Sequence, residues 1–153
     1  MLGEIVTAIL LSQGATAPSC RTADHRVEDV IVARQRELRG QEICQYRLYE
    51  TLSDVDGDRV ADFLVVFTIE GVEGSANNSI QFLALFTSRA AWRPVVVEVA
   101  RRGKRVVRSI HAVVGVVDLG TLEYAPPDPM CCPSRTGSLR VVLRDGKISV
   151  SGE

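Results

Sequence analysis

Two seven-residue runs in the middle of the chain carry apolar residues on both faces of an extended strand, and they constrain the fold more than any other feature. They are residues 63–69, FLVVFTI, and residues 80–86, IQFLALF. A strand with one exposed face alternates apolar and polar residues, whereas a central strand that is buried on both faces does not. We therefore expect two central strands, in a sheet that needs a covering layer on each face.

One helix is expected before the strands, over residues 23–39. Its apolar positions recur at three-, four- and seven-residue intervals, as on one face of an amphipathic helix: Ala23, Val27, Val30, Ile31 and Leu38. Thr22 or Asp24 can cap the start of this helix, and Gly40 suits its end. The helix would cover one face of the sheet.

The remaining strands are short and antiparallel. A period of two begins at Cys44 and places Cys44, Tyr46 and Leu48 on one inward face. Asp145-Gly146 is a two-residue turn signal that joins the last two strands in a hairpin. The expected strands after Ile80–Phe86 are residues 95–99, 105–114, 116–124, 139–144 and 147–150. The predicted fold class is α+β, with the helix packed on a strongly bent antiparallel meander sheet of seven or eight strands.

The composition indicates an ordinary globular domain, assigned to residues 18–153. The chain has 153 residues, of which 46% are hydrophobic and 24% charged, with a net charge of -1. A nucleic-acid-binding protein normally carries a basic field, which this chain lacks overall. No apolar run reaches the roughly 18 residues that a membrane span requires. We therefore expect neither a nucleic-acid partner nor a transmembrane segment.

Residues 1–17 resemble a secretory signal peptide. The apolar stretch from Ile5 to Leu11 is followed by small residues up to Ala17, which is typical of a cleavage site. Glu4 and the absence of Lys or Arg near the start are atypical, and the alternative is a cytosolic first helix. Cleavage near residues 14–17 would send the protein to the periplasm or outside the cell.

Four cysteines support export: Cys20, Cys44, Cys131 and Cys132. None of them forms a C-x-x-C spacing, so neither a zinc ribbon nor a thioredoxin-type motif is present. An even number of cysteines in a small exported domain indicates one or two disulfides. Lipidation of Cys20 is a further possibility, although the preceding Ala17-Pro18-Ser19 suits it poorly.

The sharpest local motif is the acidic loop DVDGDRVAD, residues 54–62. Acids fall at positions 1, 3, 5 and 9, a spacing at which several carboxylate oxygens can surround a calcium ion: Asp54, Asp56, Asp58 and Asp62. The glycine at position 4 and Val65 at position 12 exclude an EF-hand. The alternative is a solvated Asp/Gly turn. Calcium would act here as a structural ion, and no other cofactor is expected.

Three segments carry a resemblance to a known group of proteins. They are residues 78–86, residues 122–134, which include the Cys-Cys-Pro-Ser run, and residues 141–147. They are similar to small exported bacterial proteins that include the LppP/LprE-type lipoproteins and related uncharacterised periplasmic proteins. The resemblance spans roughly residues 44–148. It implies an exported single domain and brings no established activity.

Strand alternation places three connections at one end of the sheet: residues 71–78, 101–104 and 125–134. The four prolines of the last segment exclude regular structure. The start of the first strand lies at the same end, so we expect a disulfide from Cys44 to Cys131 or Cys132, which closes a long loop. Cys20 would pair with the remaining cysteine.

These connections favour a non-enzymatic protein that binds a partner in the bacterial envelope. The contact surface would comprise the loops at this end, with candidate residues Asn77, Asn78, Arg102, Lys104, Asp128 and Met130. One alternative is a small thiol enzyme or hydrolase that uses Cys131 or Cys132 with His111 as base. Another is a calcium-stabilised structural module.

Overall fold

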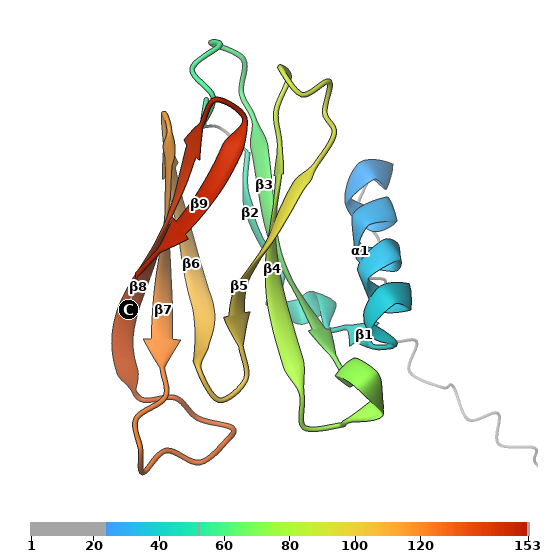
Figure 1. The fold of residues 1–153 in the computed structure, drawn as a ribbon, viewed down its shortest axis with the longest axis vertical. Coiled ribbons are helices and arrows are strands. Elements are labelled where there is room, and N and C mark those ends of the chain that lie inside the picture. Colours follow the sequence, from blue (N-terminus) through green and yellow to red (C-terminus); the bar gives the residue numbers. More distant parts are fainter. Residues whose placement is uncertain (1–23, 52, 153) are drawn as a thin grey trace, which may run out of the picture.

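The computed structural model describes residues 24–51 and 53–152 (Figure 1). One α-helix, two short 3₁₀ helices and nine strands lie within these residues. In chain order they are α1 His25–Leu38, β1 Gln41–Glu42, η1 Cys44–Tyr46, β2 Leu48–Glu50, β3 Phe63–Glu70, η2 Val72–Gly74, β4 Ser79–Phe86, β5 Val95–Arg101, β6 Arg105–Val113, β7 Val116–Glu123, β8 Arg135–Arg144 and β9 Lys147–Ser151.

Helix α1 forms where its apolar periodicity predicted it. The carboxylate of Asp24 accepts a hydrogen bond from the Arg26 amide at 2.9 Å and caps the first turn. The helix ends before Arg39, which adopts a left-handed conformation with φ 53°. Val27 and Ile31 are buried against the sheet. Ala23 and Thr22, named above for this helix, lie outside the described residues.

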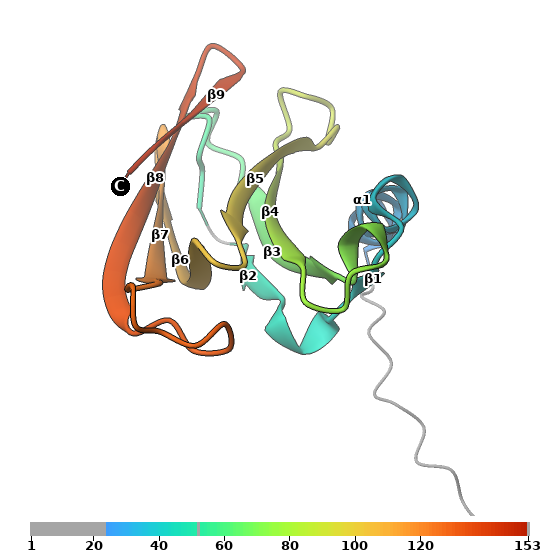
Figure 2. The ribbon, with the colours of Figure 1, turned by 60° about the horizontal axis from the view of Figure 1, so that its bottom comes forward.

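The strands form two antiparallel sheets rather than the single bent meander expected from the sequence. The first has the order β1-β3-β4-β5, with β2 also paired to β3, and the second has the order β6-β7-β8-β9. Figure 2 shows the two sheets facing each other, with α1 on the outer side of the first. The two-sided apolar strands β3 and β4 are therefore covered by a helix on one face and by a second sheet on the other. The described residues include no helix with the length and apolar character to cross a membrane.

Alternation along β3 and β4 divides the core in two. Leu64 and Val66 of β3 point into the space between the sheets, together with inward residues of β6, β7 and β8. The intervening Val65 and Phe67 point the other way, into the cluster that contains Val27 and Ile31 of α1. The expectation of two central strands buried on both faces is thus confirmed.

The segment around Cys44 does not continue the predicted alternation. Residues 44–46 form the 3₁₀ helix η1, closed by a hydrogen bond from the Arg47 amide to the Cys44 carbonyl at 3.1 Å. The Arg47 side chain turns inward, where it pairs with Glu42 and with Glu28 of α1 and is only 4% exposed. This long-range ion pair, which a local period cannot reveal, replaces the expected strand and leaves only Leu48–Glu50 extended.

Candidate functional site

The loops gather at two opposite ends of the sandwich, as strand alternation predicted (Figure 1). One end carries the β3–β4 loop, the β5–β6 turn and the loop after β7, which comprises residues 125–134 and is called the proline loop below. The acidic loop, residues 54–62, lies at the other end, with its first residues beside the tip of the β8–β9 hairpin. Each end has its own candidate site.

At the first end, a groove of about 650 Å³ opens between the two sheets. Buried side chains in its wall come from both sheets, with Gln81 of β4 and Arg105 of β6 among them. Its outer residues are aromatic, basic or sulfur-containing: Tyr46, Arg101, Arg102, Arg108, Tyr124, Met130, Cys131 and Cys132. We refer to this feature as the groove.

The layer of the core beneath the groove is polar. Gln81 joins the two sheets, because its amide nitrogen donates to Thr68 Oγ1 at 3.2 Å and its Oε1 accepts from the Val107 amide of β6 at 2.6 Å. Beside it, Thr121 Oγ1 donates to Glu123 Oε1 at 2.7 Å. These side chains occupy the same inward positions that carry Leu and Val farther along the strands. The core therefore changes from apolar to polar where it meets the groove.

Arg105 and Glu123 form a buried ion pair in this layer. They are cross-strand partners on β6 and β7, their side chains are each 5% exposed, and Arg105 Nε lies 3.3 Å from Glu123 Oε2. Nε nevertheless has no hydrogen-bond acceptor in the described part of the chain. Gly137 of β8 makes room for the pair, since a Cβ there would lie 2.6 Å from Glu123 Cγ. From the sequence these two residues were expected as parts of the strands 105–114 and 116–124, and neither was a candidate site residue.

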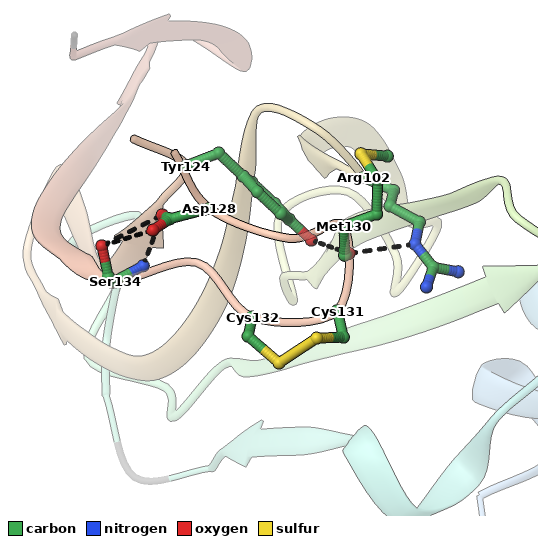
Figure 3. Close-up of a disulfide and its surroundings, with 7 residues drawn as sticks. All are labelled: Arg102, Tyr124, Asp128, Met130, Cys131, Cys132 and Ser134. Carbon is green, nitrogen blue, oxygen red and sulfur yellow. Dashed lines mark hydrogen bonds between the residues drawn. A yellow bond between two sulfur atoms is a disulfide. The ribbon is translucent and has the colours of Figure 1, made fainter. Parts of the chain in front are cut away.

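The rim of the groove is organised around one carbonyl. The carbonyl oxygen of Met130 accepts hydrogen bonds from the Tyr124 hydroxyl at 2.7 Å and from Arg102 Nε at 3.3 Å (Figure 3). Arg102 also lies 3.9 Å from Glu70 at the end of β3. The β5–β6 turn, the proline loop and β3 are thereby connected. Of the partner-binding candidates, the structure brings Arg102 and Met130 together at the groove.

Asp128 closes the base of the proline loop instead of facing the groove. Its Oδ2 accepts from the backbone amides of Ala125 at 2.7 Å and Ser134 at 2.9 Å, and the Ser134 hydroxyl donates to Oδ1 at 2.8 Å. These hydrogen bonds, led by the one from Ala125, lower the pKa of Asp128. Asn77, Asn78 and Lys104 lie in neighbouring turns at this end, and none of the three lines the groove.

The disulfide at the groove joins neighbours in sequence. Cys131 bonds Cys132, with Cα atoms 3.7 Å apart (Figure 3), so the expected bridge from Cys44 to either of them is wrong. The proline loop is tethered by Asp128, Tyr124 and Arg102, which makes a long-range bridge unnecessary. Cys44 is also in a disulfide, whereas Cys20 lies outside the described residues.

The thiol-enzyme alternative requires His111 beside Cys131 or Cys132. Cys131 and Cys132 are oxidised, and His111 is not among the residues that line the groove. His111 is exposed on β6, directly opposite Asp118 of β7. The described part of the chain therefore does not bring His111 to the groove that the two sulfurs line.

At the other end, three of the four predicted calcium ligands lie together. Carboxylate oxygens of Asp54, Asp56 and Asp58 lie within 4.8 Å of one another, so this cluster could hold a metal ion. Asp62 lies outside it: buried beneath the loop, it accepts hydrogen bonds from the amides of Val55 at 2.7 Å and Asp56 at 3.2 Å. Burial raises the pKa of Asp62, and the two hydrogen bonds oppose that shift.

Most carboxylate oxygens of the acidic loop are already engaged by backbone amides. Asp54 accepts from the amides of Gly57 at 2.7 Å, Asp58 at 3.1 Å and Arg59 at 2.8 Å. Asp58 accepts from the Val60 amide at 2.7 Å and from the Ser88 hydroxyl. Asp56 Oδ1 accepts from the Asp58 amide at 3.1 Å, but its Oδ2 has no hydrogen-bond partner among the described residues although the side chain is only 8% exposed. The buried Oδ1 of Asp62 also lacks one.

The geometry thus offers a groove with a buried guanidinium at one end and a carboxylate cluster at the other. A comparison of the chain with models of protein families, with curated proteins and with solved structures finds no match.

Proposed function

We propose that this chain is an exported, non-enzymatic binding protein of the bacterial envelope, and that its groove receives the partner. One observation carries the proposal: the Arg105 guanidinium is buried at a groove of about 650 Å³, and its Nε has no hydrogen-bond acceptor in the described chain. Buried polar groups in native proteins nearly always have a partner. A donor without one, in the wall of an open groove, is suited to a bound ligand.

Export is supported by the signal-like residues 1–17 and by the oxidised Cys131–Cys132 pair, since disulfides persist in oxidising compartments. The similarity to LppP/LprE-type proteins is part of the same proposal. Cell fractionation followed by mass spectrometry of the N-terminus tests it. A periplasmic or secreted product that begins near residue 15–18 is expected, and a cytosolic product that retains residues 1–17 would contradict export.

Site-specific photo-crosslinking tests the binding surface. Met130 at the groove rim is 53% exposed, and Val114 at the opposite end is 64% exposed, so a photoreactive residue at either position reaches solvent. In envelope extract, we expect an adduct from position 130 that is absent from position 114 and that excess unlabelled protein suppresses. Identical adducts from both positions, or none from position 130, would contradict a partner at the groove.

A second candidate property is structural calcium binding at Asp54, Asp56 and Asp58. The buried Asp56 Oδ2 without a hydrogen-bond partner favours it, because that oxygen adjoins two further carboxylates. The affinity should be weak, on the order of 10⁻⁴–10⁻³ M, as in other extracellular modules. Thermal unfolding with and without millimolar calcium tests this. A rise in Tm that is absent from Asp56→Asn is expected, and an unchanged Tm in calcium would show the loop to be a plain turn.

A further inference from the structure

We infer that the groove recognises a carboxylate on an acidic segment of a partner protein, with Arg105 as its receptor and Arg108 beside it. This inference rests on the proposed function and names the chemistry of the ligand. It is carried by the unmet hydrogen-bonding capacity of Arg105, the charge balance of the groove and the residue types at its rim.

The Arg105 guanidinium can donate more hydrogen bonds than the described chain accepts from it. A guanidinium carries five N–H groups in a planar fork that fits a carboxylate bidentately. The polar contact that the described chain supplies is Glu123 Oε2, 3.3 Å from Nε, without hydrogen-bond geometry. The Thr121 hydroxyl donates a hydrogen bond to Glu123 Oε1 and so fixes the position of the Glu123 carboxylate. A buried donor without an acceptor costs stability, so an incoming carboxylate would be stabilised by more than its charge alone.

The charge balance of the groove favours an anion. Glu123 neutralises Arg105, Glu98 pairs with Arg101, and Glu70 lies 3.9 Å from Arg102. Arg108 lines the groove and has no ion-pair partner among the described residues. It is the extra residue of a β-bulge between Val107 and Ser109, a feature that redirects a side chain. The groove therefore retains a positive charge.

The rim favours a protein segment over a bare inorganic ion. Tyr46 is 49% exposed and Met130 53% exposed, although both are large side chains with apolar surface. Tyrosine, methionine and arginine are the residue types enriched at protein interfaces. A volume of about 650 Å³ falls in the range of ligand sites, roughly 300–1,000 Å³, and accommodates a few residues of an inserted segment.

The test uses the full mature chain and two tripeptides, acetyl-Leu-Glu-Leu-amide and acetyl-Leu-Gln-Leu-amide, which differ in one charge. Binding is followed by the NMR resonance of the Arg105 Nε–H group, which reports on the proposed contact directly. We expect a saturable shift with the glutamate peptide and at least about tenfold weaker binding of the glutamine peptide, equivalent to about 1.4 kcal/mol. Equal affinities of the two peptides would overturn the inference.

Charge variants locate the effect. Arg105 itself is not substituted, because its removal would leave Glu123 buried in the core without a counter-ion. Arg108→Gln should weaken the glutamate peptide several-fold. Arg140→Gln, which removes the same charge from an exposed position of β8, should leave the affinity unchanged. Equal weakening by the two variants would show a diffuse charge effect and contradict a local site.

Inorganic phosphate serves as the second probe. If phosphate moves the Arg105 resonance with the affinity of the glutamate peptide, the groove is a general anion site and the assignment to a protein carboxylate is overturned. The outcome also separates the two proposals. An adduct at position 130 without glutamate-peptide binding refutes the carboxylate while the proposed function stands, whereas loss of both refutes both.

Discussion

At the acidic end of the sandwich, Asp54 uses its carboxylate on three backbone amides of its own loop, whereas at the groove end Arg105 keeps a buried guanidinium whose Nε has no hydrogen-bond acceptor. Both ends concentrate charge, but in the acidic loop the hydrogen bonds run between residues close in sequence, apart from the one that Ser88 donates to Asp58. At the groove, the bonds run between strands and between sheets. Carboxylates bound by nearby amides stabilise their own loop, whereas the Arg105 Nε, which lacks an acceptor despite the ion pair with Glu123, is the feature on which our proposed ligand site rests.

The contrast also shows that polar groups in one layer of the core differ in how far they are satisfied. Both polar atoms of the Gln81 amide have a partner, since its nitrogen donates to Thr68 and its oxygen accepts from Val107. Arg105 occupies an inward position of the same layer, and its Nε has no hydrogen-bond acceptor among the described residues. This difference, rather than the number of charges, is why we propose the groove as the binding site.

The largest expected effect comes from breaking the buried pair. Glu123→Gln should lower the free energy of unfolding by about 3 kcal/mol, because it leaves Arg105 charged and buried without its counter-ion. Urea denaturation measures this. The matched control is Glu98→Gln, which breaks the half-exposed pair with Arg101 and should cost about 1 kcal/mol or less.

The double variant Arg105→Leu with Glu123→Leu sharpens the same point. Replacement of a buried ion pair by apolar side chains is often neutral or stabilising, so the double variant should be more stable than Glu123→Gln alone. If Glu123→Gln costs no more than Glu98→Gln, the guanidinium is already well solvated, and the contrast between the two ends disappears.

A smaller effect is expected where the backbone makes room for the pair. In Gly137→Ala the new Cβ would lie 2.6 Å from Glu123 Cγ and 2.9 Å from Thr121 Oγ1, so the side chains must shift. We expect a loss of about 2 kcal/mol, the usual cost of overpacking, measured by thermal unfolding. Ser138→Ala, at the exposed neighbouring position, should change stability by no more than about 0.5 kcal/mol. Equal effects would mean that Glu123 is loosely held.

At the acidic end the expected effect is smaller still. Asp54→Ala should cost about 1 kcal/mol in the presence of a chelator, similar to the loss of a helix N-cap, because three amides lose their acceptor. Asp29→Ala, on the exposed side of α1, is the control and should be nearly neutral. A neutral Asp54→Ala would show that the loop is not held by its own carboxylate, and metal binding would then be its main support.

Much of this architecture could be predicted from local patterns. The helix followed from its apolar intervals, the two central strands from their two-sided apolar runs, and the last hairpin from Asp145-Gly146. Strand alternation even placed the β5–β6 turn and the proline loop at one end. The division into two sheets could not be predicted. The apolar runs of β3 and β4 require that both faces be covered, but a curled edge of the same sheet and a second sheet meet that requirement equally well.

The candidate site was less predictable, because its chemistry depends on pairs far apart in sequence. A signal for the buried ion pair did exist: Arg105 shares its parity with Val107 on β6, and Glu123 shares its parity with Leu119 on β7. Because Val107 and Leu119 face the core, the same alternation places the side chains of Arg105 and Glu123 on the inward faces of their strands. The Cys131–Cys132 bond had no such signal. A disulfide that closes a long loop is expected to stabilise a fold more than a bond between neighbouring residues. The hydrogen bonds that hold the proline loop without such a bridge could not be predicted from the sequence.

In the proline loop, the Asp128 carboxylate accepts hydrogen bonds from its own loop, as the Asp54 carboxylate does at the other end. Hydrogen bonds from Ala125 and Ser134 lower the pKa of Asp128, so the folded loop prefers the ionised form. This stabilisation is fully present above the unfolded pKa of about 3.9 and is lost as the pH falls through the lower folded value. Protection factors for exchange of the Ala125 and Ser134 amides should therefore fall on acidification below about pH 4.

Asp128→Asn should remove that pH dependence, whereas Asp118→Asn, which removes an exposed carboxylate from β7, should preserve it. If the amides of Asp128→Asn open over the same pH range as those of the native chain, another group holds the loop, and the rim of the groove is not secured by its own carboxylate.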